Sequence, residues 1–303
     1  MTIRLSSLLA LMVLVSACAP QPQPLPAPLP TAEAEMIAAP MTVYFPVAIK
    51  SDPLVIDQRA GPEICMAWSG QFLDKAKVDF GANMYYHSGT WRVPNQNSIP
   101  IVRSLPGHRE DIANQLLYLK SIKWNGLVVL ANEPDMVDQD NIKFPKDLAG
   151  LYWYATQVLP DATFIVPNAI DLNYLDEFLD YATIRSKDRI GIHIYQGNRY
   201  DNVHTWPTDW ITRLEVILSE HNTDNRYWIS EAGLAEAWTP DINARYVSEI
   251  LSSDAEVACF YTTNCGTYVP GCGWDLYDRS GALTTGGNAL RSIAFPLQAN
   301  AYP

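Results

Sequence analysis

Basic residues are scarce in this chain. Its 303 residues include 21 Lys and Arg against 33 Asp and Glu, which gives a formal net charge of -12 at pH 7. Binding to a nucleic-acid backbone needs clustered cations that release counterions from the phosphates. The composition therefore argues against nucleic acid as a partner and favours a neutral one, such as a carbohydrate.

Patterns typical of metal and nucleotide sites are also missing. The five Cys and five His residues form no Cys-x-x-Cys or His-x-x-x-His pair, so zinc has little support. Asp135 and Asp138 lack the regularly spaced oxygen ligands of a calcium site. Residues 67–70, Ala-Trp-Ser-Gly, are not the Gly-rich loop of an open nucleotide-binding sheet. We expect no metal and no cofactor.

The N-terminus has the pattern of an export signal. Arg4 precedes an apolar run over residues 8–15 that is too short to span a membrane as a mature helix. Val-Ser-Ala-Cys at 15–18 resembles the lipobox of bacterial lipoproteins, so we expect residues 1–18 to be a signal segment and Cys18 to be lipidated. The protein would then be anchored to a membrane, facing the periplasm or the cell exterior. Cleavage after Ala19 is the alternative, and it would release a secreted protein.

Export places the remaining cysteines in an oxidising compartment. Cys265 and Cys272 flank a short loop containing Gly and Pro, and we predict a disulfide between them. Cys65 and Cys259 lie in apolar segments, where either buried thiols or a bridge would fit.

The sequence predicts one folded domain after a spacer. Alternating prolines in the segment 19–41 favour extended polyproline II and leave no apolar face to bury. Residues 42–303 are predicted to form a single domain, with no internal repeat, and we expect a monomer.

Within that domain, short apolar runs alternate with segments of helical period, as in a parallel sheet with crossover helices. The predicted strands are 63–67, 82–86, 99–103, 127–131, 163–167, 189–194, 227–230 and 257–261. Eight strands close a barrel, so we predict an α/β fold of the (β/α)₈ TIM-barrel type. An open doubly wound sheet is the structural alternative.

Helical stripes fill most of the intervals. Apolar positions predict helices near 112–119, 148–159, 172–179 and 288–294, and Thr239-Pro240-Asp241 is a typical helix start. We interpret Trp153 and Trp210 as core residues on such stripes. The stretch 88–98 has no clear helix, so the second βα unit is expected to be degenerate.

Two glutamates end predicted strands, where barrel enzymes place their chemistry. Strand four ends Asn132-Glu133-Pro134, and strand seven ends Ser230-Glu231-Ala232-Gly233. Hydrolysis of a glycosidic bond needs one carboxylic acid to protonate the leaving oxygen and a carboxylate to attack or stabilise the anomeric carbon. The pair therefore predicts an O-glycosyl hydrolase.

On these two motifs the chain resembles clan A of the glycoside hydrolases, a superfamily of retaining enzymes. The resemblance implies that Glu133 is the general acid/base, that Glu231 is the nucleophile, and that Asn132 bonds the sugar 2-hydroxyl. Asn132-Glu133-Pro134-Asp135 and Ile192-His193-Ile194-Tyr195 look most like the small β-1,3-glucanase family related to fungal cell-wall proteins, with xylosidases and exopolysaccharide hydrolases as competitors. The resemblance to the β-1,3-glucanase family implies a β-glucanase that acts on a polysaccharide or oligosaccharide.

Further residues are expected to bind substrate or support the glutamates. His193 and Tyr195 share one face of strand six by alternation, and in the resembling enzymes such a residue bonds the nucleophile. Arg103 could pair with Glu133 or contact substrate, although structural pairing is the preferred interpretation. Aromatic residues near strand ends offer flat faces to sugars, and the candidates are Trp68, Tyr86, Trp238 and Trp274.

Two other functions remain open from the sequence. A lipoprotein with the same barrel could bind carbohydrate without hydrolysing it, or the barrel could serve as a surface scaffold for protein contacts. The presence of both glutamates favours the hydrolase over these two alternatives.

Overall fold

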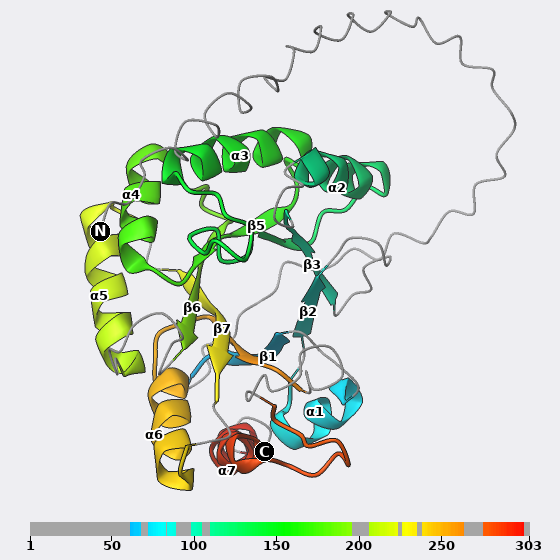
Figure 1. Cartoon of the computed structure of the whole chain (residues 1–303), viewed down its shortest axis with the longest axis vertical. Helices are drawn as coiled ribbons and strands as arrows, with labels where there is room; N and C mark the ends of the chain where they lie inside the picture. Colours follow the sequence, from blue (N-terminus) through cyan, green and yellow to red (C-terminus); the bar gives the residue numbers. More distant parts are fainter. Residues whose placement is uncertain are drawn as a thin grey trace, which may run out of the picture. The chain divides into compact units, whose positions relative to one another are not determined.

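Eight short parallel strands form a closed barrel in the order β1-β2-β3-β4-β5-β6-β7-β8, so the predicted barrel is confirmed and the open sheet is excluded (Figure 1). The computed structural model describes residues 61–67, 72–82, 84–88, 98–104, 110–195, 206–223, 226–234, 238–263 and 275–299. The strands are β1 (Glu63–Ala67), β2 (Met84–Ser88), β3 (Ser98–Val102), β4 (Leu127–Leu130), β5 (Thr163–Ala169), β6 (Arg189–Tyr195), β7 (Tyr227–Gly233) and β8 (Val257–Tyr261).

Alternating side chains along the strands divide the core into two layers. One layer fills the barrel interior and consists of Cys65, Ala67, Ile99, Ile101, Val129, Ile165, Trp228, Val257 and Cys259. The other lies between the strands and the helices, and it includes the outward residues Met66, Val128, Phe164, Ile192 and Phe260. Because both faces of the strands are buried, the strand sequences are almost continuously apolar.

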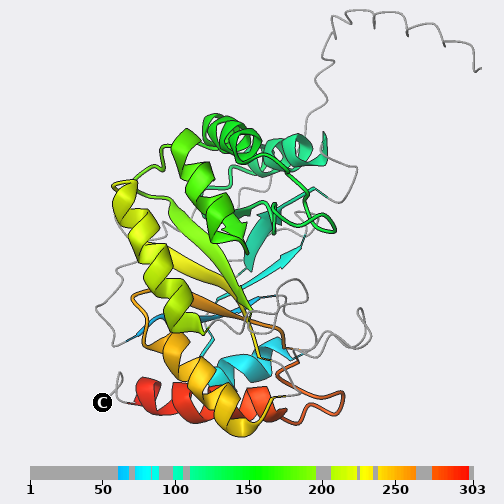
Figure 2. The ribbon, with the colours of Figure 1, turned by 60° about the vertical axis from the view of Figure 1, so that its left-hand side comes forward.

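Helices surround the strands (Figures 1 and 2). They are α1 (Leu73–Phe80), α2 (Glu110–Ser121), α3 (Pro145–Val158), α4 (Leu172–Tyr181), α5 (Pro207–Glu220), α6 (Pro240–Leu251) and α7 (Thr285–Ala299). The predicted start of α6 is confirmed, since the Thr239 side chain accepts a hydrogen bond from the backbone N–H of Ile242 and Pro240 occupies the first turn.

One core prediction is wrong. The Trp153 side chain is 66% exposed, whereas its neighbour Tyr152 is buried. Successive helix positions are rotated by about 100°, so Tyr152 faces the barrel while Trp153 points outward from α3. Trp210 is half-buried and packs against the core, as expected.

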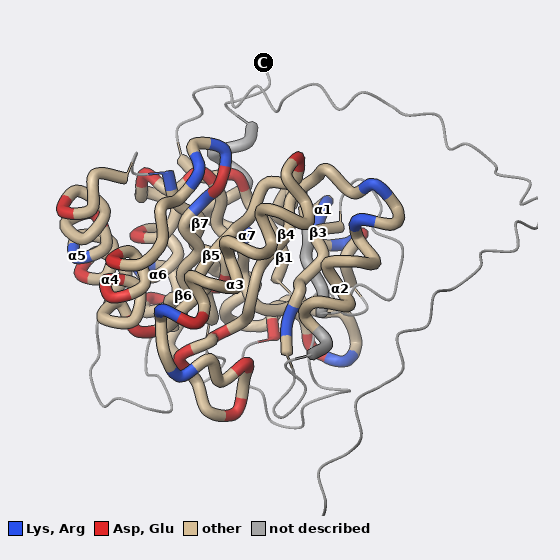
Figure 3. The backbone as a smooth tube through the Cα atoms, turned by 90° about the horizontal axis from the view of Figure 1, so that it is seen from above, with Lys and Arg blue, Asp and Glu red and all other residues tan. Residues whose placement is uncertain are grey.

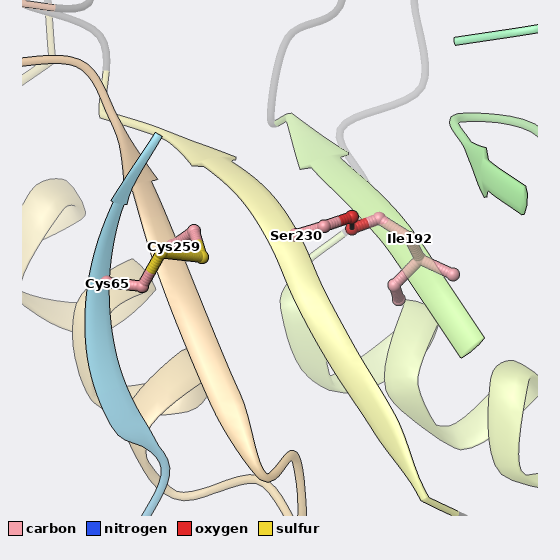
Figure 4. The surroundings of a disulfide bond; sticks show 4 residues. All are labelled: Cys65, Ile192, Ser230 and Cys259. Carbon is pink, nitrogen blue, oxygen red and sulfur yellow. Dashed lines mark hydrogen bonds between the residues drawn. A yellow bond between two sulfur atoms is a disulfide. The ribbon is translucent and has the colours of Figure 1, made fainter. Parts of the chain in front are cut away.

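Barrel closure joins the two ends of the domain. β1 pairs with β8 in parallel, and Cys65 stands opposite Cys259 in the register. These two residues are fully buried and form a disulfide across the closing seam, which decides the question that the sequence left open (Figure 4). The crosslink spans 194 positions of sequence.

Acidic side chains dominate part of the helical layer. The sequence of α4 contains three acidic residues and no basic one, and red segments follow α4 and α5 in Figure 3. This side of the molecule would repel a polyanion, in keeping with the composition.

Several sequence-based predictions fall outside the described residues. These are the signal segment with Cys18, the spacer 19–41, the domain start at 42, the stretch 89–97 between β2 and β3, and the predicted Cys265–Cys272 bridge. All the described residues belong to one compact unit, Ile56–Pro303. Among them, no helix combines the length and apolar character needed to cross a membrane.

We predict that the double variant Cys65→Ala/Cys259→Ala is less stable by up to about 5 kcal/mol, because a loop of this length loses much chain entropy when it is closed. Urea unfolding measured with and without a reductant checks this. The matched control is Cys265→Ala/Cys272→Ala, because the bridge predicted there would close a far shorter loop and its loss would cost about 2 to 3 kcal/mol. Equal losses for the two double variants would contradict the assignment of the large effect to the barrel seam.

Candidate active site

Glu133 lies at the C-terminal end of β4, in the β4–α3 loop (residues 131–144). Its backbone N–H donates to the carbonyl of Asn168 over 3.1 Å, and its own carbonyl accepts from Met136 N–H over 2.9 Å. Ala131 and Glu133 both have left-handed backbone conformations, with φ of 66° and 45°. Since such conformations are uncommon for residues other than glycine, the surroundings must hold this part of the loop in place.

Glu231 reaches the barrel interior because β7 is irregular. Ile229 and Ala232 both belong to the layer beneath the helices, although regular alternation would put residues three apart on opposite faces. The register against both β6 and β8 shifts at this point, which indicates one extra residue in β7. Glu231 precedes Ala232 and therefore faces the interior.

Ser230 stabilises the irregular part of β7. Its buried hydroxyl donates to the carbonyl of Ile192 on β6 over 3.0 Å, the hydrogen bond drawn in Figure 4. The hydroxyl thus satisfies a carbonyl where the register shifts, and it helps to keep Glu231 turned inward.

His193 and Tyr195 lie beside the two glutamates. His193 Nδ1 is 3.1 Å from Glu133 Oε1 and 3.4 Å from Glu231 Oε2. The Tyr195 hydroxyl donates to Glu231 Oε2 over 2.5 Å. The predicted sharing of one strand face by His193 and Tyr195 is therefore confirmed, and the two residues connect the carboxylates into one cluster.

The cluster is largely shielded from water. The side chains of His193, Glu231 and Glu133 are 1%, 6% and 14% exposed. Burial opposes the imidazolium form, but Glu231 and Glu133 outweigh it and raise the pKa of His193 above 6.5. Burial and the same two carboxylates raise the pKa of Tyr195 well above its usual value, so Tyr195 stays a neutral hydrogen-bond donor.

The spacing of this cluster would also permit a metal ion. One ligand atom each from Glu133, His193 and Glu231 lie within 4.8 Å of one another. The contacts of His193 with the carboxylates have the length of hydrogen bonds, which accounts for the close approach without an ion. The expectation of no metal site stays a prediction.

A network of polar side chains supports the β4–α3 loop on the β3 side. Asp140 Oδ2 accepts the backbone N–H of Asn132 over 2.8 Å, and Asp140 Oδ1 is 3.2 Å from Arg103 Nε. Gln139 Oε1 accepts from Arg103 Nη2 at 2.6 Å and from Asn132 Nδ2 at 3.3 Å. Arg103 therefore pairs structurally, as preferred from the sequence, but its partner is Asp140.

Asp135 fastens the same loop on the β5 side. Its Oδ2 accepts the backbone N–H groups of Ile170 and Asp171 over 3.0 and 2.6 Å. Burial raises the pKa of Asp135 to about 6 and that of Asp140 to about 7, against the hydrogen bonds that each receives. The sequence did not indicate a structural role for Asp135 or Asp140, because Ile170, Asp171 and Arg103 come from segments that are distant in the chain.

The structure also describes the side chains of two other predicted site residues, Asn132 and Trp238. Asn132 is 5% exposed, and its amide nitrogen bonds Gln139. Trp238 is half-buried, with its ring 5.5 Å from that of Tyr246. Tyr86 lies on β2, but its side chain is outside the described part, as are Trp68 and Trp274. Tyr261 of β8, which the sequence did not assign to the site, packs its ring 6.3 Å from that of Tyr195.

No protein-family model matches this sequence. No curated protein matches it either. Solved structures with a similar fold do exist. One is a curdlan-specific exo-β-1,3-glucanase of GH128 subgroup III from Blastomyces gilchristii, at 17% identity and a TM-score of 0.52, covering 76% of this chain and 98% of that one.

Two others extend the comparison. A GH128 oligosaccharide-binding protein from Trichoderma gamsii has 14% identity and a TM-score of 0.51, covering 79% of this chain and 96% of that one. A β-xylosidase from Caulobacter crescentus has 11% identity and a TM-score of 0.56, covering 78% and 69%. At these identities the likeness establishes a fold shared with glycoside hydrolases, as the resemblance implied.

We predict that His193 titrates above 6.5 in the folded protein. Since its pKa is raised on folding, its protonation stabilises the fold fully below 6.5, and this contribution is lost as the pH rises through the folded value. An NMR titration of the imidazoles, with His193→Gln used to assign the signal, measures the pKa directly. As the pH rises through the pKa of His193 in the folded protein, the Tm of the wild type should fall more steeply than the Tm of His193→Gln. A signal that titrates below 6.5 would show that burial dominates over the carboxylates.

Proposed function

We propose that this protein is a retaining glycoside hydrolase that cleaves a β-linked glucan, with Glu133 as acid/base and Glu231 as nucleophile. The observation that carries the proposal is the pair of carboxylates at the barrel mouth, meaning the C-terminal ends of the strands, where Glu231 is buried and Glu133 is largely shielded from water. Paired carboxylates of this kind suit a reaction that needs one proton donor and one anion on opposite sides of a single bond.

Their separation supports retention of anomeric configuration. A carboxylate oxygen of Glu133 lies within 4.8 Å of one of Glu231. Retaining enzymes place their carboxyl groups about 5 to 5.5 Å apart, whereas inverting enzymes leave about 6.5 to 9.5 Å for a water molecule. The short separation favours direct attack by one carboxylate.

The surroundings of each glutamate favour the assigned roles. Glu231 is the more buried of the two, accepts the Tyr195 hydroxyl and faces His193 Nδ1. Donors to a carboxylate favour its anion, which is the form that attacks. Glu133 is more exposed and lies in a loop, where it can reach both the leaving group and an incoming water.

The reaction then proceeds in two displacements. Glu231 attacks the anomeric carbon while Glu133 transfers its proton to the departing glycosidic oxygen, which leaves a glycosyl-enzyme ester. Glu133, now a carboxylate, takes a proton from water, and the resulting nucleophile displaces Glu231 and regenerates both groups. Asn132, from the same loop, is proposed to bond the sugar 2-hydroxyl.

A β-glucan is the proposed substrate class. Glucanases are among the proteins of similar fold, including a β-glucanase from Saccharophagus degradans at 10% identity and a TM-score of 0.51. A neutral polysaccharide also fits a chain with a net charge of -12.

A carbohydrate-binding protein without turnover is the second candidate. The observation in its favour is the similar fold of the oligosaccharide-binding protein from Trichoderma gamsii. The two candidates differ in whether the glutamates perform chemistry, so substitution of each glutamate discriminates between them.

We further propose that the protein is exported and held at a membrane by a lipid on Cys18. The disulfide between Cys65 and Cys259 supports an oxidising compartment, because disulfides are rare in reducing ones.

We predict that Glu133→Ala lowers kcat on laminarin by about 10²- to 10⁴-fold, the usual contribution of an acid/base group. On a 2,4-dinitrophenyl β-glycoside, whose leaving group needs no proton, azide should partly restore the rate of this variant by attacking the glycosyl-enzyme, and NMR should identify a β-glycosyl azide. Glu231→Gln should release no detectable reducing ends and gain nothing from azide. An α-azide from Glu133→Ala would reverse the two roles.

The matched control is Glu220→Ala, which removes an exposed glutamate at the end of α5 and should leave the rate unchanged. Oligosaccharide binding without turnover by the wild-type protein, on a broad panel of β-glycans, would favour the second candidate. Activity that survives EDTA would separate this chemistry from that of a metal bound by the same glutamates.

We also predict that Cys18→Ala moves the full-length protein from the membrane fraction to the soluble fraction of exporting cells. Mass spectrometry of the mature N-terminus should find a diacylated cysteine in the wild type. A mature protein that begins after Ala19 without a lipid would contradict anchoring and support secretion.

A further inference from the structure

Strand β5 is irregular at Asn168. The register between β5 and β6 shifts between Pro167 and Ala169, and Asn168 has a left-handed backbone with φ of 58°. This residue is completely buried, although asparagine is polar. A buried polar side chain on a backbone with positive φ persists when its hydrogen bonds stabilise the neighbouring backbone.

Those hydrogen bonds lead to the loop that carries Glu133. Asn168 Nδ2 lies 3.2 and 3.3 Å from the carbonyl oxygens of Leu130 and Ala131, and 2.8 Å from that of Ile165. The backbone carbonyl of Asn168 accepts the N–H of Glu133 over 3.1 Å. Asn168 therefore holds the backbone before and at Glu133 and anchors it to β5.

The segment that Asn168 holds, residues 131–133, contains two unfavourable backbone conformations. Ala131 and Glu133 each have positive φ, a conformation that residues other than glycine adopt only where the surroundings impose it. The side-chain amide of Asn168 donates to the carbonyl of Ala131, and the backbone carbonyl of Asn168 accepts the N–H of Glu133. A single residue therefore restrains both positions.

Gly191 on β6 makes room for this arrangement. A Cβ atom added to Gly191 would lie 2.1 Å from Asn168 Oδ1 and 2.7 Å from Ile165 Cγ2. Gly191 is two residues before His193 and faces the same side of β6. The side chain of Asn168 thus lies in the interior next to the catalytic cluster, at a place where only glycine leaves enough space.

We propose that Asn168 is a positioning residue that sets the location of the Glu133 carboxyl group, and that Gly191 is present to admit its side chain. The catalytic part of this inference rests on the proposed function. Asn168 does not touch the substrate and acts only through the β4–α3 loop. Displacement of a proton donor by about 1 Å can cost about 10²-fold in rate.

The test compares Asn168→Gly with Asn222→Gly. Glycine tolerates the positive φ and keeps the backbone carbonyl, so Asn168→Gly removes only the amide. Asn222 also has positive φ, 53°, but is exposed and follows α5 at the opposite end of the barrel. The two variants make the same chemical change at two ends of the barrel.

The readout is kcat/KM on phenyl and 2,4-dinitrophenyl β-laminaribiosides, which reports formation of the glycosyl-enzyme. Dinitrophenolate leaves without a proton, whereas phenolate needs one. We expect Asn168→Gly to lose about 10²-fold on the phenyl glycoside and little on the dinitrophenyl glycoside. Asn222→Gly should match the wild type on both. Equal losses on the two substrates, or none, would overturn the proposal.

A second readout does not depend on activity. His193 Nδ1 contacts Glu133, so displacement of Glu133 should lower the pKa of His193 in an NMR titration of Asn168→Gly. An unchanged pKa would overturn the positioning role. If the wild type hydrolyses no glycoside, the proposed function fails, while this measurement still decides the role of Asn168.

Gly191→Ala provides an independent variant in case Asn168→Gly does not fold. It leaves every hydrogen-bonding group in place and displaces Asn168 by contact with its Oδ1. We expect the same selective loss on the phenyl glycoside and the same fall in the pKa of His193. A folded Gly191→Ala protein with wild-type values for both would contradict the proposal.

Discussion

Closure of the barrel through the β1–β8 pair is the constraint on which the candidate site depends. Glu133 follows β4 and Glu231 lies in β7, with β5 and β6 between them, and the curvature of the barrel brings an oxygen of each carboxylate within 4.8 Å of the other. The ladder between β1 and β8 and the buried disulfide between Cys65 and Cys259 hold that ring shut.

Within the closed ring, irregularities in two strands determine the positions of Glu231 and Glu133. The extra residue in β7 turns Glu231 from the helical layer to the interior, and Ser230 satisfies the carbonyl of Ile192 at that point. A second irregularity in β5 places Asn168 where it can hold the backbone around Glu133. Bulges are often found beside active sites because they redirect a side chain without disturbing the rest of the sheet.

The electrostatics of the cluster follow from burial and proximity. Two carboxylates in a shielded interior repel each other, and a charged imidazole between them reduces that cost. His193 contacts both carboxylates, and the neutral Tyr195 hydroxyl adds a donor to Glu231 alone. The two glutamates therefore occupy different environments, the usual basis for different roles in one reaction.

The sequence by itself determined the local features of this protein. Apolar runs predicted the eight strands, and alternation placed His193 and Tyr195 on one face. The tertiary structure decided what depends on distant partners. It paired Cys65 with Cys259, gave Arg103 the partner Asp140, exposed Trp153 and brought Asn168 under the β4–α3 loop. Periodicity is a property of neighbouring residues, whereas register, bulges and buried pairs arise only when strands far apart in the chain meet.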